Sequence, residues 1–159
     1  MRKRCHRRAV VPLPPRGLRP KLSRAQILDL AIVHHENLDV IARGQADEST
    51  LWQWIGGVLT WSRVAQVLDR GVVEMAFQLE LAKRMVDRYR RTGRVLFDGL
   101  DYQQAKVGVD VMDQLAELVD LVTASAAAEW SENETNRMSV ECDAQRAQSA
   151  TSAERIACH

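Results

Sequence analysis

The sequence contains no apolar run of roughly eighteen residues or more, the length that a membrane-spanning helix requires. Aromatic residues make up only 5% of the chain, so most of any core must be aliphatic. The cationic N-terminus is followed by prolines at positions 12, 14, 15 and 20 instead of an apolar stretch, which argues against a secretory signal. We therefore expect a cytoplasmic protein that does not associate with a membrane.

Cysteine is scarce, and its distribution does not suggest disulfides. Cys5, Cys142 and Cys158 are an odd number without regular spacing, which does not form a disulfide framework. A reducing, intracellular setting fits this pattern.

The histidines do not predict a metal site. His34 and His35 are adjacent, so on a helix their side chains point about 100° apart. His35 and Asp39 share a helix face, but two ligands are fewer than a closed zinc site requires. We therefore predict neither a metal nor a cofactor.

Charge is distributed unevenly along the 159 residues. Of the 22 cations, nine precede residue 25, where there is no acid; the remaining 13 face all 21 acids, a net charge of −8. Such a split predicts a basic arm, residues 1–22, that is disordered, in front of a mildly acidic body. The arm is either a solvated tail without a fixed partner or a site for nucleic acid. The cations proposed to contact nucleic acid are Arg2, Lys3, Arg4, Arg7, Arg8, Arg16, Arg19, Lys21 and Arg24.

The stretch Thr50 to Tyr89 has the clearest helical periodicity, in two segments separated by Gly71. Asp47 is a suitable N-cap for the first segment, and Gly71 suits a left-handed C-cap at its end. Apolar residues three and four positions apart share one helix face, which predicts a helix hairpin. The two apolar rows are Trp54, Val58, Trp61, Ala65 and Leu68, then Val72, Met75, Leu79, Ala82, Val86 and Tyr89.

Two further helices complete the prediction. Ser23 is a suitable N-cap for a helix from about Arg24 to Arg43, and an unbroken apolar row predicts one long helix from about Asp98 to Arg137. Residues 139–159 are polar and predict a disordered tail. The fold class is thus all-α: a small antiparallel four-helix bundle, residues 23–138, with a long C-terminal helix and the basic N-terminal arm.

Gly56 and Gly57 lie in the middle of the second predicted helix, where each costs about 1 kcal/mol relative to alanine. Either a neighbouring helix approaches closely there or the helix kinks, and we favour close approach.

Two groups of surface residues are candidates for interactions. Trp52 lies off the apolar row and Trp130 lies on the long last helix, so both are candidate contacts with another protein. Arg84, Arg88 and Arg91 share one face of the third helix, where they either hold phosphates or pair with the acidic final helix.

Several short motifs resemble small proteins encoded in bacterial prophages and related phages. They are the opening Met1 to Cys5 with the proline-containing arm, the turn Arg43 to Ala46, and Arg91 to Arg94 before the last helix. The resemblance covers roughly residues 1–138. Such proteins have unassigned activities, so the resemblance implies a helical fold and a phage-related context without implying a reaction.

No Ser/His/Asp, Cys/His or metal constellation lies in a region predicted to be structured, so we do not expect an enzyme. The sequence favours a non-enzymatic phage or prophage accessory or regulatory protein that binds DNA or RNA non-specifically through its arm, because no helix rich in Arg, Asn and Gln is available to read bases. The alternative is a helical protein–protein interaction module that acts through the last helix, as a homodimer or with a helical partner.

Overall fold

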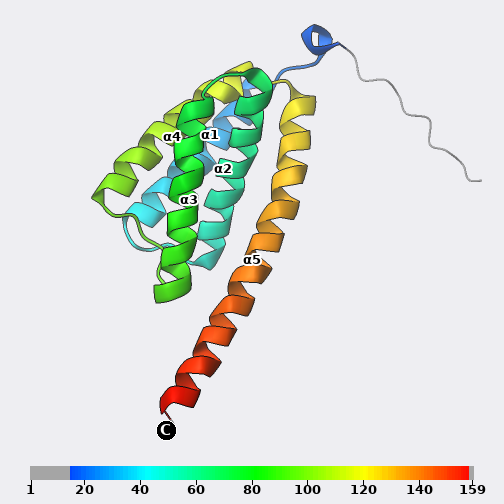
Figure 1. Ribbon diagram of the computed structural model, residues 1–159. Coiled ribbons are helices and arrows are strands. Elements are labelled where there is room, and N and C mark those ends of the chain that lie inside the picture. Colours follow the sequence, from blue (N-terminus) through cyan, green and yellow to red (C-terminus); the bar gives the residue numbers. More distant parts are fainter. Residues whose placement is uncertain (1–14, 158–159) are drawn as a thin grey trace, which may run out of the picture.

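The computed structural model describes residues 15–157, of which residue 16 and residues 150–157 are described by their backbone alone. This part of the chain forms five α-helices, as Figure 1 shows. The all-helical prediction is confirmed, but there are five long helices where four were expected. A short 3-10 turn, η1 (Arg16–Leu18), precedes α1 (Arg24–Ala42), α2 (Glu48–Leu68), α3 (Val72–Thr92), α4 (Gly99–Leu118) and α5 (Leu121–Ala157).

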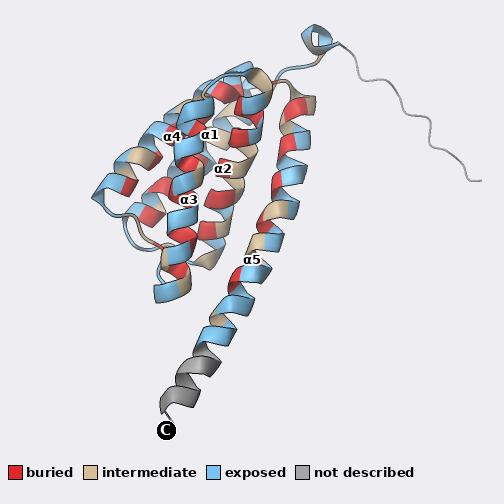
Figure 2. Ribbon diagram, in the orientation of Figure 1, coloured by how far each residue is buried: buried red, intermediate tan, exposed pale blue. Residues whose placement is uncertain are grey.

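Helix α2 is the centre of the fold, because it packs against each of the other four helices. Its apolar residues occupy more than one side, as expected for a helix that is covered by several neighbours. Trp54 and Trp61 are 3% and 2% exposed, which confirms that both belong to the core. In Figure 2 the buried residues of the surrounding helices lie on the faces turned toward the centre of the body. The fully buried side chains of α2 include Leu51, Ile55, Val58 and Val64.

The predicted starts of α1 and α2 are confirmed by their caps. The Ser23 hydroxyl accepts a hydrogen bond from the Gln26 amide while the Gln26 side chain accepts one from the Ser23 amide, forming a capping box. Asp47 accepts a hydrogen bond from the Thr50 amide at 2.8 Å. In both cases a short polar side chain satisfies an amide that has no partner within the helix.

The turn between α2 and α3 differs in detail from the prediction. Asp69 is the C-cap of α2 in the left-handed conformation (φ 53°), and Gly71, expected in that role, directly precedes α3 (φ 65°). Aspartate tolerates this conformation better than most residues. Two features favour glycine at position 71. Its φ is positive, and a Cβ at this position would lie 2.8 Å from Cγ1 of Val111 in α4.

The prediction of one helix from about Asp98 to Arg137 is wrong. α4 ends at Leu118, Val119 is extended, and the Asp120 carboxylate accepts hydrogen bonds from the amide and hydroxyl of Thr123 at 2.8 Å each. Aspartate in this position competes with the helical backbone and caps a new helix. The apolar row continues through the break, so periodicity alone concealed it.

The prediction of a disordered polar tail over residues 139–159 is wrong for residues 139–157, because α5 continues to Ala157 and projects past the other helices (Figure 1). Residues 158 and 159 lie outside the described residues. Cys142 is 1% exposed on the side of α5 that packs against the body. Small and polar residues precede it at four-residue spacing on the same face. They lack a strong apolar signal, yet they pack well on α2: Thr123, Ala127, Ser131 and Thr135.

The glycine pair does not interrupt α2, which is continuous from Glu48 to Leu68. Gly56 faces Thr135 of α5 and Gly57 faces His34 of α1. A Cβ would lie 3.5 Å and 3.8 Å from these side chains, an ordinary contact distance. Neighbouring helices therefore pack here as expected, although not so closely that only glycine fits.

We predict that Gly71→Ala destabilises the protein more than Gly44→Ala. Both glycines have a positive φ, which costs alanine about 1 kcal/mol, but only Gly71 would also bring a Cβ against Val111. Chemical denaturation should show a loss of about 1 kcal/mol for Gly44→Ala and about 2 kcal/mol or more for Gly71→Ala. Equal losses would show that the contact between the turn and α4 relaxes without cost.

Candidate functional site

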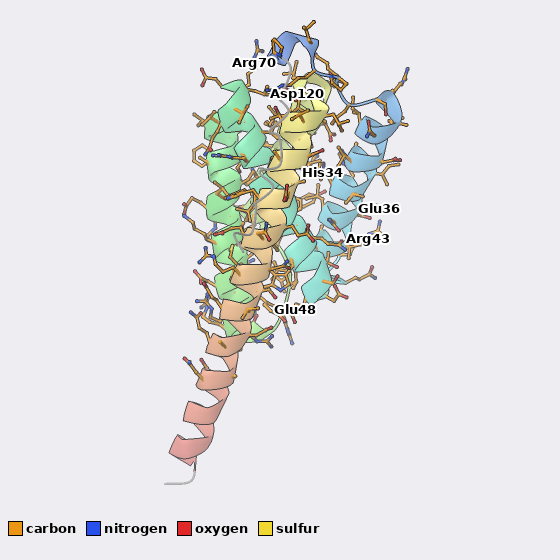
Figure 3. All side chains as sticks on the ribbon, turned by 90° about the vertical axis from the view of Figure 1, so that its right-hand side faces the viewer. His34, Glu36, Arg43, Glu48, Arg70 and Asp120 are labelled. Atoms are coloured by element: carbon orange, nitrogen blue, oxygen red, sulfur yellow. The ribbon has the colours of Figure 1, made fainter. Side chains whose placement is uncertain are left out.

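The segment that connects the basic arm to α1 is fixed on the body. The Pro20 carbonyl accepts a hydrogen bond from the Leu121 amide at 2.8 Å, and Lys21 forms an isolated backbone bridge with Asp120. An Arg19 Nη atom lies 4.0 Å from an Asp120 carboxylate oxygen. Asp120 therefore both caps α5 and contacts this segment. Figure 3 shows it near the start of α5. The prediction that residues 1–22 form a disordered arm is wrong for residues 15–22.

The structure describes the side chains of only three of the nine N-terminal cations. Arg2, Lys3, Arg4, Arg7 and Arg8 lie outside the described residues, and only the backbone of Arg16 is described. Arg19 is partly buried, whereas Lys21 and Arg24 are exposed on the body.

The basic face of α3 is held by acids at the start of α4. Arg84 donates to Asp101 Oδ1 at 3.1 Å, and Arg88 donates to Asp101 Oδ2 at 2.8 Å. Burial alone raises the pKa of Asp101, which is 3% exposed, but the hydrogen bonds from Arg88 and Arg84 outweigh it and lower the pKa. Arg91 is exposed and donates to the Asp87 carbonyl at 3.3 Å. Of the two interpretations of this face, pairing with acids therefore describes Arg84 and Arg88, and their partner Asp101 lies within the stretch that was predicted as the final helix.

A surface hollow of about 300 Å³ lies beside the attached segment. Its lining includes Arg19 from that segment, Arg63 from α2 and Trp130 from α5. The Trp130 ring is 45% exposed, and the Arg63 guanidinium carbon lies 6.0 Å from its centre. We call this feature the Arg63–Trp130 hollow. It combines cations with an exposed aromatic side chain, the two features through which proteins bind single-stranded nucleic acid.

Trp52 is less available than expected, because it belongs to a polar cluster that joins three helices. Its indole N–H donates to Glu48 Oε1 at 3.1 Å, and Tyr89 donates to Glu48 Oε2 at 2.7 Å. Arg146 of α5 donates to the Tyr89 oxygen at 2.7 Å and stacks over the Tyr89 ring. The hydrogen bonds from Tyr89 and Trp52 lower the pKa of Glu48. This Glu48 cluster holds α5 against α2 and α3.

A cavity of about 390 Å³ lies between α1, α2 and α5. It forms because α1 and α5 both pack on α2 but, in the described part of the chain, do not pack on each other. Figure 3 shows His34 pointing from α1 into the space between these helices, whereas Glu36 and Arg43 lie on the outer side of α1. We call this feature the α1–α2–α5 cavity.

His34 is fixed in the wall of this cavity by hydrogen bonding. The Trp61 indole N–H donates to His34 Nε2 at 2.9 Å, so Nε2 is unprotonated and Nδ1 carries the proton. Nδ1 lies 3.9 Å from an Asp113 oxygen, and His35 Nε2 lies 3.0 Å from the other oxygen of Asp113. Burial lowers the pKa of His34 below its usual 6.5, and Asp113 offsets this only in part. The imidazole is therefore neutral at pH 7.

No group of three or more His, Cys, Asp or Glu side chains in the described ranges is arranged to hold a metal ion. His35 pairs with Asp113, across helices, and lines a separate hollow that also includes Asp39. Likewise, none of the described helices is long and apolar enough to cross a membrane.

Sequence reasoning missed the α1–α2–α5 cavity and the Glu48 cluster. Trp61 belongs to the predicted apolar row of the second helix and His34 to the first helix, but no sequence pattern brings the two side chains to a shared cavity. For the Glu48 cluster, the only local signal was an acid in the first turn of a helix. Its partners lie 41 and 98 positions away in the chain, at Tyr89 and Arg146.

Comparison with known proteins gives no relative: no family model, curated protein or solved structure matches this chain.

We predict that Glu48→Gln destabilises the protein by about 1–2 kcal/mol at pH 7, because charged hydrogen-bond acceptors contribute more than neutral ones. The pKa of Glu48 is lower in the folded than in the unfolded chain, so its stabilisation is complete above about pH 5. It is lost as the pH falls below 4.5 toward the folded-state pKa. Urea denaturation at several pH values should therefore show the difference from wild type shrinking in acid.

The matched control is Glu36→Gln, which removes an exposed carboxylate from the outer side of α1. It should change stability by less than about 0.5 kcal/mol at any of these pH values. A Glu48→Gln defect that persists unchanged at low pH would mean that shape, not charge, holds the cluster together.

Proposed function

We propose that this protein is a non-enzymatic accessory or regulatory protein that binds nucleic acid without sequence preference. The observation that carries the proposal is the charge distribution: nine cations and no acid in the first 24 residues, ahead of a body with a net charge of −8. Cations gathered in this way neutralise phosphates and release counterions, which supplies most of the affinity in non-specific binding. In keeping with the resemblance to prophage-encoded proteins, we propose a phage-related, cytoplasmic context.

The attachment of residues 15–22 supports this proposal by giving the preceding cations a defined starting point on the body. That point lies beside the Arg63–Trp130 hollow, because Arg19 lines the hollow and approaches Asp120. We therefore assign the phosphate contacts to the N-terminal cations and not to Arg84 and Arg88, which pair with Asp101.

The second candidate function is a helical interaction module that forms a homodimer through α5. It is favoured by the projection of α5 past the other helices and by exposed apolar side chains on it, Trp130 and Val140, at 45% and 69% exposure. For the architecture, we propose an antiparallel bundle enlarged by one helix, since short connections join each helix to the next.

We predict that nucleic-acid binding depends steeply on salt and requires the N-terminal cations. A variant with Arg2, Lys3, Arg4, Arg7 and Arg8 replaced by Gln should make the negative slope of log K against log salt on duplex DNA shallower by about 4.5, if each cation meets one phosphate. Fluorescence anisotropy over a range of salt concentrations measures this slope.

The matched control replaces Arg2, Arg4, Arg7 and Arg8 by Lys, which keeps every charge. Because the mechanism is phosphate neutralisation, this variant should bind nearly as tightly as wild type. Unchanged binding by the Gln variant, or no binding by the wild type at low salt, would contradict the proposal.

For the dimer, we predict a concentration-dependent increase in mass by light scattering. Val140→Glu should shift the equilibrium to monomer, because it places a charge in an apolar contact, whereas Gln145→Glu, exposed on a different side of α5, should not. A constant monomer mass for the wild type over the accessible concentrations would reject this candidate.

A further inference from the structure

The Arg63–Trp130 hollow carries charge of the opposite sign to the body around it. From residue 25 onward the chain has 13 cations and 21 acids, a net charge of −8, yet the charged side chains in the described lining of the hollow are both arginines, Arg19 and Arg63. Arg19 is partly buried beside Asp120, whereas Arg63 is exposed. Arg63 is therefore the cation that an incoming anion meets on this part of an otherwise acidic surface.

Trp130 supplies the hollow with an aromatic ring that the fold leaves accessible. Its side chain is 45% exposed, whereas Trp54 and Trp61 are almost fully buried. Ala126, one helical turn earlier on the same face of α5, also lines the hollow and is too small to cover the ring. The Arg63 guanidinium carbon lies 6.0 Å from the ring centre, at the outer limit of about 6 Å for a cation–π contact. A ligand that stacks on Trp130 therefore has only a weak contact to replace.

An exposed ring beside a cation matches the chemistry of an unpaired nucleotide. A base stacks on an aromatic ring through its π face, while the adjoining phosphate pairs with a cation. In a duplex each base is stacked between its neighbours and offers no free face unless it is flipped out. The volume of about 300 Å³ is at the lower end of the range for small-molecule sites, so the hollow suits one base and not a paired helix.

The hollow is also joined to the cations proposed to hold phosphates. Arg19 belongs to the segment that the hydrogen bond between Leu121 and Pro20 fixes on the body, and the five cations before residue 9 precede this segment in the chain. Once these cations hold a strand, the hollow meets a base of the same strand at a raised effective concentration. Polyanionic strands with accessible bases are therefore favoured over short anions.

We infer that the Arg63–Trp130 hollow binds one unpaired base of a single-stranded nucleic acid, which stacks on Trp130 while Arg63 contacts an adjoining phosphate. This inference rests on the proposed nucleic-acid function and deepens it, because it names single strands as the preferred class. Charge alone favours the duplex, which has the higher density of phosphates, so a preference for single strands requires a contact with the bases.

The test uses the full chain and three fluorescein-labelled probes of equal length: oligothymidylate, a duplex, and a strand of abasic sites that keeps the phosphates but has no bases. Fluorescence anisotropy should show oligothymidylate binding about tenfold or more tighter than the abasic strand. Its advantage over the duplex should grow with salt, because stacking persists where phosphate contacts are weakened.

Substitutions in the hollow separate stacking from charge. Trp130→Ala should weaken oligothymidylate about tenfold and leave the abasic strand unchanged, whereas Trp130→Phe, which keeps a ring, should retain most of the affinity. Arg63→Gln should weaken both strands and make the salt slope shallower by about 0.7, the loss of one phosphate contact on a single strand. The matched control is Phe77→Ala, which removes a 59% exposed ring from α3 outside the hollow and should leave binding unchanged.

Tryptophan fluorescence gives a second measurement at the same site. Oligothymidylate should quench the fluorescence of the wild type, because a base stacks on the exposed Trp130, and Trp130→Phe should lose most of this quenching although it still binds. Circular dichroism and light scattering show whether each variant keeps its fold and mass.

The inference is overturned if the wild type binds oligothymidylate no tighter than the abasic strand, or if folded Trp130→Ala binds like wild type. It is also overturned if Trp130→Ala weakens both strands equally, and a simultaneous fall in mass would assign Trp130 to a dimer contact instead. Salt-dependent binding of all three probes that ignores Trp130 would reject the hollow and leave the proposed function standing. Absence of binding to every probe would reject both.

Discussion

The fold depends on one constraint, that α2 is apolar on more sides than a single neighbour can cover. Burying Leu51, Ile55, Val58 and Val64 together requires helices around α2, and it packs against all four others. Hydrophobic burial of this kind is the main favourable contribution to folding. The same arrangement leaves α1 and α5 separated on α2, so the packing that stabilises the protein also produces the α1–α2–α5 cavity.

Polar contacts then fix how the outer segments meet this core. Asp120 caps α5 and lies beside the attached segment, Glu48 joins α2 to α3 and α5 through Tyr89 and Arg146, and Asp101 binds Arg84 and Arg88. Each is a charged side chain with several hydrogen-bond partners, which is the condition for a partly buried charge to be tolerated. These contacts also occupy charges that would otherwise be open to a partner, which is why the proposed phosphate contacts are assigned to the N-terminal cations.

Two features of functional interest lie close together at the start of α5. Leu22 and Leu121 line the α1–α2–α5 cavity, and the Leu121 amide donates to Pro20 in the segment that leads to the basic arm. Arg19 in the same segment lines the Arg63–Trp130 hollow. The connection between α4 and α5 is therefore where the apolar cavity, the exposed aromatic ring and the path to the N-terminal cations meet.

The amino-acid sequence alone determined the helical class, the caps at Ser23 and Asp47, and the burial of Trp54 and Trp61, because these follow from local periodicity and from hydrogen bonds between residues three or four apart. It did not predict the break at Asp120, because the apolar row continues across it and the Leu121 amide finds its acceptor in distant Pro20. It did not predict the helix beyond residue 139 either, because Cys142 and Arg146 are ordered by contacts with the body and not by a periodic apolar face. The cavity and the Glu48 cluster were decided by tertiary structure, since each brings together side chains from helices whose separation in space no local pattern encodes.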